Sequence, residues 1–416
     1  MRERMLALAA VVAACAWGAT TATAAPLDTT GTLGAAPYRL AAPEAWNGTL
    51  VVLAHGYRDL ADHPGEVDDV SPDGGFTALI GALTASGYAV ASSAYSSNGW
   101  AVKDAVQDLT NLAAFARGRI GRPERTLLVG FSLGSIPTLD LAESRDGVFD
   151  GYLPACAVAA GSPRAWDSAA AGLVAWQAVF GPLPAAWGTV ADGDDDVDFE
   201  TEALPILGGL LMNPLNFGRF EFMRLITHVP LSPGYYPGGL ATNVFFITEA
   251  RGELERRAGG PVAQNLTHTY SLSAADRAYL GTLGVSGTQV DAWLATMNGT
   301  RFAAAPAQRN WIEKYATFTG KLHAPVLTLH TVVDTLVPVQ HESAYAATVA
   351  AAGSGDQLLQ VYTNGTSHCG FAPVQVPLAI AQLDAWVRTG VRPSPAAFPA
   401  ALGFVPGFVP PPWPQP

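Results

Sequence analysis

The sequence predicts an α/β fold in which a mostly parallel central sheet is flanked by helices and interrupted by a mainly helical insertion. Short apolar runs alternate with segments whose apolar residues recur at helical spacing, which is typical of parallel strands joined by helices. This alternation stops near Gly161 and resumes at Pro325, so the residues between them form the insertion. The expected strands are residues 49–54, 88–94, 125–129, 152–160, 326–330 and 358–362, and the expected core helices include residues 76–86, 102–120 and 135–143.

These patterns divide the chain into five parts. Residues 1–24 are expected to be a signal peptide, because Arg2 and Arg4 precede an apolar stretch that is followed by the small residues of Ala22-Thr23-Ala24. The Pro-rich tail is expected to lie over the surface or to be disordered, since Pro is poorly tolerated inside helices and central strands. The other parts are an N-terminal core part (25–160), a cap (161–320) and a C-terminal core part (321–392), with the tail at 393–416.

The leader and the composition bear on location and partners. Cleavage after Ala24 predicts a secreted protein; the alternative is a lipobox at Val12-Ala13-Ala14-Cys15, which would make the protein a lipoprotein anchored through Cys15. No other stretch has 18 uninterrupted apolar residues, so no transmembrane segment is expected. The formal net charge of −12 argues against nucleic acid as a partner, and the oligomeric state stays open.

No motif calls for a metal or a cofactor. The three cysteines are too few and too far apart for a zinc cluster. An acidic run from Asp192 to Asp198 superficially resembles a calcium loop, but Val197 and Ala203 stand where an EF-hand needs Gly and Glu. A solvated loop is the expected interpretation of this run.

The most informative motif is Gly130-Phe131-Ser132-Leu133-Gly134, which follows an expected strand and precedes an expected helix. A serine on such a sharp strand-to-helix turn is held in strained dihedrals with its hydroxyl exposed. The residues two before and two after it crowd the turn, which explains small residues at Gly130 and Gly134. The pattern indicates a nucleophile elbow with Ser132 as the nucleophile.

A nucleophilic serine needs a base and an acid that orients the base. His368 lies in a Gly-flanked polar loop just after the last expected strand, and Asp334 follows the strand at residues 326–330. Both positions are at strand ends, so the two side chains are expected to meet Ser132 at one edge of the sheet. The other histidines are less well placed; His330 lies on a strand, and His341 is expected on an exposed segment.

With these residues the chain resembles the secreted bacterial α/β-hydrolases of the serine esterase and lipase type that carry an inserted cap. The order Ser132, Asp334, His368 is the order of that fold. The resemblance implies that Ser132 attacks an acyl carbon, His368 shuttles the proton and Asp334 orients the imidazole. It also implies an oxyanion hole made by the backbone N–H groups of Leu133 and Tyr57.

Two cysteines remain if cleavage removes Cys15. Cys156 lies in the strand after the nucleophile helix, and Cys369 adjoins His368, whose loop must cross that part of the sheet to reach Ser132. A Cys156–Cys369 disulfide that holds the catalytic loop is therefore predicted. The alternative is a pair of buried free thiols.

The leading functional prediction is a serine hydrolase that cleaves a carboxylic ester of a small-molecule acyl substrate through an acyl-enzyme. One alternative is a serine exopeptidase of the same fold, with Glu249, Glu253 or Glu255 as an amine anchor, although acids on a charged helix are usually solvated. A second alternative is a non-catalytic binding protein that retains the fold. Cap residues such as Trp176 and Phe220 either line an acyl pocket or form the core of the cap, and residues 244–247 form a strand-like run.

Overall fold

The structure is a computed structural model that describes residues 26–59, 75–144, 147–194 and 196–414. The predicted signal peptide, Cys15 and Asp195 of the acidic run lie outside these residues. Within the described ranges, none of the helices is both long enough and apolar enough to cross a lipid bilayer.

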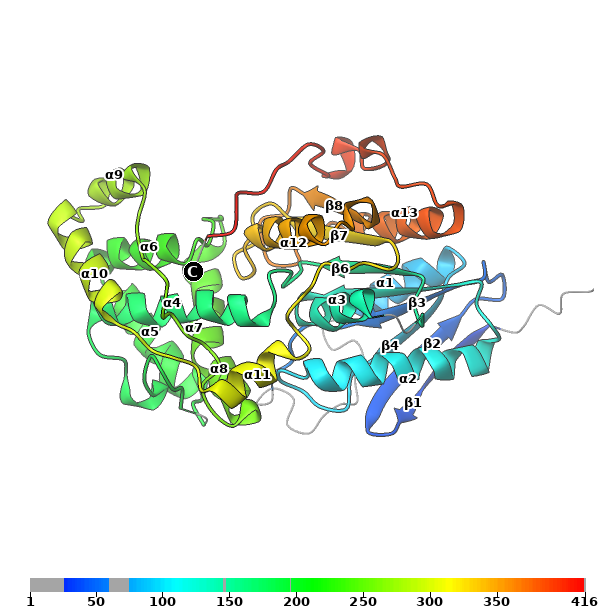
Figure 1. Cartoon of the computed structure of the whole chain (residues 1–416), viewed down its shortest axis with the longest axis horizontal. Helices are drawn as coiled ribbons and strands as arrows, with labels where there is room; N and C mark the ends of the chain where they lie inside the picture. The colour runs from blue at the N-terminus through cyan, green and yellow to red at the C-terminus, as the bar shows by residue number, and fades with distance from the viewer. Residues whose placement is uncertain (1–25, 60–74, 145–146, 195, 415–416) are drawn as a thin grey trace, which may run out of the picture.

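An eight-stranded sheet forms the centre of the core (Figure 1). Its strand order is β1-β2-β4-β3-β5-β6-β7-β8, and β2 runs antiparallel to both of its neighbours while the remaining pairs are parallel. The strands are β1 (Leu27–Leu33), β2 (Ala36–Ala42), β3 (Thr49–Ala54), β4 (Ala89–Ser93), β5 (Arg125–Phe131), β6 (Gly151–Ala155), β7 (Val326–Thr331) and β8 (Leu358–Thr363).

Helices cover both faces of this sheet, which explains why its central strands are continuous apolar runs. On β3, Val52 packs into the layer of α2 (Val102–Ile120) and α3 (Ser135–Glu143), whereas Val51 packs into the opposite layer, with α1 (Gly75–Ala85) and α13 (Gln375–Thr389). A further helix, α12 (Gln340–Ala351), lies between β7 and β8 in the chain.

The architecture is the α/β-hydrolase fold, as predicted. The six expected strands are present, although β6 ends at Ala155 rather than near residue 160. The sequence patterns missed β1 and β2. Both strands are partly exposed, and β1 reads LDTTGTL, so neither shows the continuous apolar run that marks a strand buried on both faces.

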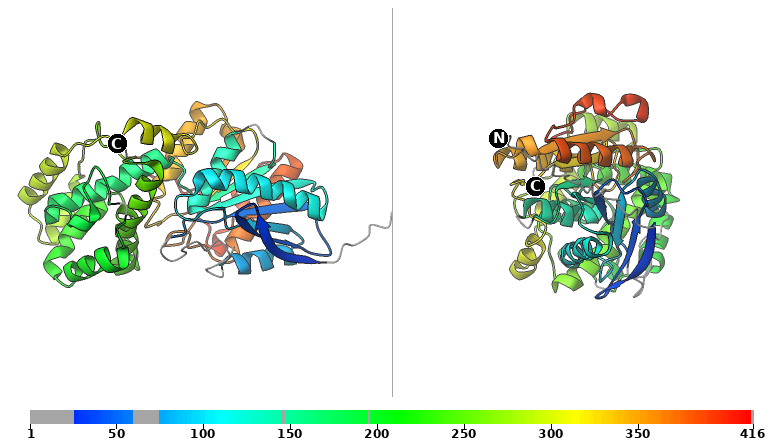
Figure 2. Two further views of the ribbon diagram at one scale, coloured as in Figure 1. Left: turned by 90° about the horizontal axis from the view of Figure 1, so that it is seen from below. Right: turned by 90° about the vertical axis from the view of Figure 1, so that its right-hand side faces the viewer.

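Between β6 and β7 the described residues form helices joined by loops, with a single isolated β-bridge between Gly188 and Gly193, and Figures 1 and 2 show this cap at one end of the sheet. The strand-like interpretation of residues 244–247 is wrong, because they form the end of α7. Val244 and Ile247, three residues apart, are the buried pair, which is helical spacing. The helices are α4 (Ser162–Phe180), α5 (Leu204–Leu211), α6 (Phe217–Ile226), α7 (Leu240–Ile247), α8 (Glu249–Ala258), α9 (Ala274–Thr282), α10 (Gly287–Gly299) and α11 (Pro306–Glu313).

Three of the large aromatic residues of the cap belong to its own core. Trp176, Phe220 and Phe222 are almost fully buried, and the Phe220 ring lies 5.1 Å from that of Phe180. They fill the space between α4 and α6, so they are not free to contact a substrate.

The Pro-rich tail is ordered against the core up to residue 414. Its regular structure is limited to 3₁₀ turns at Pro395–Ala397 and Ala400–Leu402, as the proline content requires. Phe398 and Phe404 are buried beside α13, and the N–H of Val405 donates to the carbonyl of Tyr362 at 2.9 Å. Figure 1 shows the tail running over β8 toward the cap, so that it extends from the core to the cap.

Candidate active site

Ser132 lies at the point where β5 ends and a 3₁₀ turn leads into α3. Its φ angle is +52°, in the left-handed region that costs a non-glycine residue about 1–2 kcal/mol. The strain is local to the turn that projects the side chain above the carboxyl end of the sheet. The backbone thus has the geometry that the sequence motif predicts for a nucleophile elbow.

Two glycines make this turn possible. A Cβ on Gly134 would lie 2.5 Å from the carbonyl oxygens of both Ala54 and His55, on the neighbouring strand β3 and its following turn. A Cβ on Gly130 would overlap the carbonyl oxygen of Gly134 and the hydroxyl of Thr138. The positions two before and two after Ser132 therefore admit no side chain while the turn keeps its shape.

His368 lies between Ser132 and Asp334. Its Nε2 is 2.8 Å from the Ser132 Oγ, and its Nδ1 is 2.8 Å from the Asp334 Oδ2. The imidazole can hence accept the serine proton at Nε2 while Nδ1–H donates to the carboxylate. Three side chains that are as much as 236 residues apart in the sequence thus meet at the carboxyl end of the parallel strands.

Asp334 is fully buried and held by two backbone donors. The N–H groups of Leu336 and Val337 donate to its Oδ1 at 2.9 and 2.8 Å, which leaves Oδ2 for His368. Burial alone would raise the pKa of Asp334, but the neighbouring His368 and His330 outweigh it and hold that pKa below its ordinary value. The carboxylate is therefore ionised at neutral pH.

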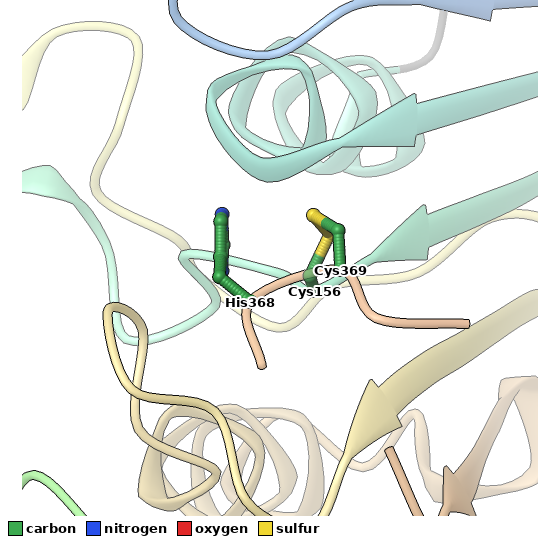
Figure 3. A group of neighbouring side chains, drawn as sticks. All are labelled: Cys156, His368 and Cys369. Carbon is green, nitrogen blue, oxygen red and sulfur yellow. A yellow bond between two sulfur atoms is a disulfide. The ribbon is translucent and has the colours of Figure 1, made fainter. Parts of the chain in front are cut away.

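A disulfide joins the His368 loop to the sheet. Cys369 is bonded to Cys156, which directly follows β6, and Figure 3 shows the His368 ring beside this bridge. The Cα atoms of the two cysteines are 5.1 Å apart, and both residues have positive φ angles. The loop that carries His368 is thus linked covalently to the end of β6.

The structure reveals a second histidine–carboxylate pair that sequence reasoning missed. His330 on β7 and Glu342 on α12 are fully buried, with Nδ1 and Oε1 3.4 Å apart, and the His330 Nε2 is 3.5 Å from the Asp334 Oδ2. Burial disfavours the imidazolium, yet Glu342 and Asp334 raise the pKa of His330 above its ordinary value. A histidine inside an apolar strand and a glutamate on a later helix gave no pattern that could indicate their contact.

His341 is also buried, so the expectation that it lies on an exposed segment is wrong. Its Nδ1 accepts the N–H of Ala160 at 3.1 Å, and its ring packs against Trp413 of the tail. Burial lowers the pKa of His341 to about 3, so it is neutral at physiological pH.

The turn expected to supply part of the oxyanion hole lies against Ser132. A Cβ on Gly56 would be 3.2 Å from the Ser132 Cβ, and Tyr57 and Leu133 both line a cavity that reaches Ser132. His55 does not point at the hydroxyl: its Nδ1 is 2.6 Å from the Gly56 carbonyl, and its ring stacks on Tyr95. His55 therefore shapes the turn, while the donor roles of Tyr57 and Leu133 stay predictions.

Two cavities meet at Ser132. The larger, of about 1090 Å³, is open and is lined by His368 and by the acids Asp59, Asp198, Glu200 and Glu249. Burial, and secondarily the nearby Asp59, raises the pKa of Glu249 to about 7. The smaller cavity, of about 130 Å³, extends from Ser132 into the cap.

One cluster of metal-ligand type side chains occurs in the described residues, namely Cys156, His368 and Cys369. Both sulfur atoms are in the disulfide, and both nitrogens of His368 are within 2.8 Å of Ser132 or Asp334. A disulfide sulfur is not the thiolate that metals bind, so the cluster does not fit a metal in this oxidised form.

No protein-family model matches the chain, and no curated protein is similar to it in sequence. Solved structures that resemble it include the closed state of Candida antarctica lipase A, with 14% identity over 89% of this chain and 78% of that chain and a TM-score of 0.43. Others are proline iminopeptidase of Mycobacterium smegmatis (14% identity, 88% and 100%, TM-score 0.42) and epoxide hydrolase A of Mycobacterium thermoresistibile (16%, 86% and 98%, 0.37). These scores are too low to carry an argument about function.

Proposed function

We propose that the protein is a serine hydrolase that cleaves a carboxylic ester through an acyl-enzyme. The observation that carries this proposal is the His368 ring, which is 2.8 Å from the Ser132 Oγ on one side and 2.8 Å from the buried Asp334 carboxylate on the other. This arrangement supplies a nucleophile, its general base and the acid that orients the base.

In the first half of the reaction, His368 Nε2 accepts the proton of Ser132 as Oγ attacks the ester carbonyl. The negative charge that develops on the carbonyl oxygen is stabilised by the backbone N–H groups of Leu133 and Tyr57. His368 then gives its proton to the alkoxide, which leaves as an alcohol. Water, deprotonated by His368, attacks the acyl-enzyme; the carboxylic acid is released and the proton returns to Ser132.

The protein is proposed to work outside the cytoplasm. The predicted leader supports export, and the Cys156–Cys369 disulfide fits an oxidising compartment. The exported protein is either cleaved after Ala24 and secreted, or lipidated at Cys15 and anchored to a membrane. The mass of the mature protein distinguishes these two forms.

The proposal is tested with a fluorophosphonate probe, which reacts with an activated serine. We expect labelling of the wild-type enzyme at Ser132 and turnover of p-nitrophenyl esters, with both abolished in Ser132→Ala while the unfolding midpoint is retained. The matched control is Ser86→Ala at an exposed serine at the end of α1, which should label and turn over normally. A folded wild-type protein that is not labelled at Ser132 would favour the non-catalytic alternative.

One observation keeps the exopeptidase alternative in view. Glu249 lines the same cavity as Ser132 and His368, where it could bind an amine. Each of the three candidate anchors accepts a backbone N–H: Glu249 from Phe199 at 2.6 Å, Glu253 from Trp100 at 2.8 Å and Glu255 from Gly193 at 2.6 Å. Glu253 and Glu255 do not line the cavity that holds Ser132 and His368. Glu253 and Glu255 are buried, contrary to the solvated interpretation. Faster hydrolysis of aminoacyl anilides than of acyl esters would establish the exopeptidase.

A further inference from the structure

The two cavities at Ser132 can be assigned to the two halves of an ester. Ser132 and Tyr57 line both cavities, His368 lines only the larger, and Leu133 lines only the smaller. The general base must deliver its proton to the leaving oxygen, so the alcohol half lies on the side of His368. The acyl half must then extend in the other direction, past Leu133 and into the smaller cavity.

The smaller cavity is mainly apolar. Its walls come from α4, α6 and α7 of the cap and include Trp166, Met223, Val244 and Ile247. Most of the lining is hydrocarbon, so an apolar group that enters the cavity leaves water and contacts apolar side chains, which favours a hydrocarbon. The Tyr57 hydroxyl, Trp166 Nε1 and Asn243 Oδ1 are buried in lining residues without a hydrogen-bond partner in the described part of the chain, so a neutral polar substituent can also be paired there.

The ionisable side chains on this wall offer no free charge. Burial raises the pKa of the Tyr57 and Tyr235 phenols, so both are neutral at physiological pH. Arg224 pairs with the buried Glu221, with Nη2 2.7 Å from Oε2, and its Nη1–H donates to the carbonyl of Val229 at 2.8 Å. His341 is buried and neutral at physiological pH because burial lowers its pKa to about 3. An acyl group that carries an ammonium or a carboxylate would find no counter-ion here, whereas the acids of the larger cavity lie on the side of the alcohol.

The size of the cavity sets a limit on the acyl group. Its volume is about 130 Å³. For comparison, an engineered apolar cavity of about 150 Å³ in another protein holds one benzene molecule. Roughly six carbon atoms therefore fit beyond the carbonyl, while a dodecanoyl chain does not.

We infer that the smaller cavity is the acyl-binding site and that it selects compact, uncharged acyl groups, from butanoyl to hexanoyl or benzoyl, over long fatty acyl chains. This inference rests on the proposed function, because it assigns a substrate class to the serine nucleophile. It also implies that variation in the alcohol half is tolerated, since the larger cavity is open and about eight times the volume of the smaller, 1090 against 130 Å³.

Gly172 on α4 lines this cavity, so a substitution at this position can reduce the space for the acyl group. A Cβ built on it would meet Ile247 at 3.5 Å and Thr227 at 3.7 Å, both ordinary van der Waals distances and both side chains of the cavity wall. Alanine thus fits at this position, and a longer side chain would extend into the cavity. Ile247, opposite, is the residue whose truncation would enlarge the same space.

The test measures kcat/KM for p-nitrophenyl esters from acetyl to dodecanoyl, together with the benzoyl ester. For the wild type we expect a rise of about fourfold for each added methylene up to hexanoyl, which is the free energy of burying one methylene expressed as a rate ratio. Dodecanoyl should then react at least tenfold more slowly than hexanoyl. Gly172→Leu should lower the ratio of the hexanoyl to the acetyl kcat/KM at least tenfold.

Ile247→Ala should shift the optimum in the opposite direction, toward octanoyl and longer, which a folding defect cannot imitate. The matched control is Gly209→Leu on the exposed side of α5, where a Cβ meets nothing within 4 Å, and its chain-length profile should equal that of the wild type. If Gly172→Leu does not fold, Gly172→Ala and Ile247→Ala carry the comparison.

The outcomes separate the two proposals. If Ser132 is labelled by the fluorophosphonate and acetyl esters are cleaved, but the profile still rises to dodecanoyl or ignores both cavity variants, the acyl-site inference is overturned and the hydrolase proposal stands. If Ser132 is not labelled and no ester is cleaved, the hydrolase proposal itself fails. An optimum at butanoyl to hexanoyl that moves in opposite directions in the two variants supports both.

Discussion

Removal of the Cys156–Cys369 disulfide should weaken both the fold and the geometry of the candidate active site. The bridge joins residues separated by 213 positions, so the cross-linked unfolded chain loses a large amount of conformational entropy. For a loop of this length the chain-entropy relation predicts a stabilisation of about 5 kcal/mol. Since domains typically unfold at a cost of about 5–15 kcal/mol, Cys156→Ala/Cys369→Ala should lose a third or more of its stability.

The same variant should lower kcat more than it raises KM. Cys369 adjoins His368, so the bridge restrains the backbone that positions the Nε2 atom 2.8 Å from the Ser132 Oγ. Other contacts remain in the loop, such as the hydroxyl of Thr331, which donates to the Ser367 carbonyl at 3.1 Å. A displacement of about 1 Å at a reacting group can cost on the order of 100-fold, so we expect kcat to fall between about 10- and 100-fold.

Urea unfolding followed by tryptophan fluorescence measures the first effect, and steady-state hydrolysis of a short acyl ester measures the second. Dithiothreitol supplies the matched control: it should bring the wild type to the behaviour of the double variant and leave the variant unchanged. Equal unfolding midpoints and equal kcat values for the oxidised wild type and the double variant would refute the reasoning that the bridge stabilises this loop.

Two further predictions concern the elbow and the larger cavity. Gly134→Ala should reduce kcat/KM at least 100-fold, because its Cβ would lie 2.5 Å from the carbonyl oxygens of Ala54 and His55. The control is Gly281→Ala, where a Cβ meets nothing within 4 Å and full activity should be kept. An active Gly134→Ala enzyme would contradict the steric argument. Glu249→Gln should flatten the pH dependence of stability. The pKa of Glu249 in the native state is raised to about 7, so between its ordinary pKa and pH 7 the native state keeps a proton that the unfolded chain has released. The free energy of unfolding of the wild type therefore falls as the pH rises toward 7, and the variant lacks this contribution. Urea midpoints between pH 4.5 and 8 measure this, with Glu44→Gln at an exposed site as control, and equal slopes in Glu249→Gln and the wild type would contradict it.

Patterns in the sequence were sufficient for the parts of the fold that depend on local physical constraints. Strands buried on both faces must be continuous apolar runs, so β3 and β5 were recognisable, and α2 was predicted at its observed bounds. The partly exposed strands β1 and β2 escaped notice because they lack that constraint. Residues 244–247 were misassigned because four apolar residues in a row are compatible with either a strand or a helix.

The same division holds for the candidate site. The elbow could be identified because a sharp turn excludes side chains at Gly130 and Gly134, and that requirement is written into five consecutive residues. Asp334 and His368 could be nominated because each follows a predicted strand, and the carboxyl ends of parallel strands meet at one edge. The hydrogen-bonding distances from His368 to Ser132 on one side and to Asp334 on the other, however, are a property of the folded chain.

The order of the core elements, the elbow and the three candidate site residues thus follow from the amino-acid sequence, because each depends on steric or burial rules that act over a few neighbouring residues. The tertiary structure alone decided that His330 and Glu342 lie behind Asp334, that His341 is buried, and that a cavity of about 130 Å³ opens from Ser132 into the cap. Those features arise where α4, α6, α7, β7 and α12 pack together, and packing between distant segments leaves no periodic trace in the sequence.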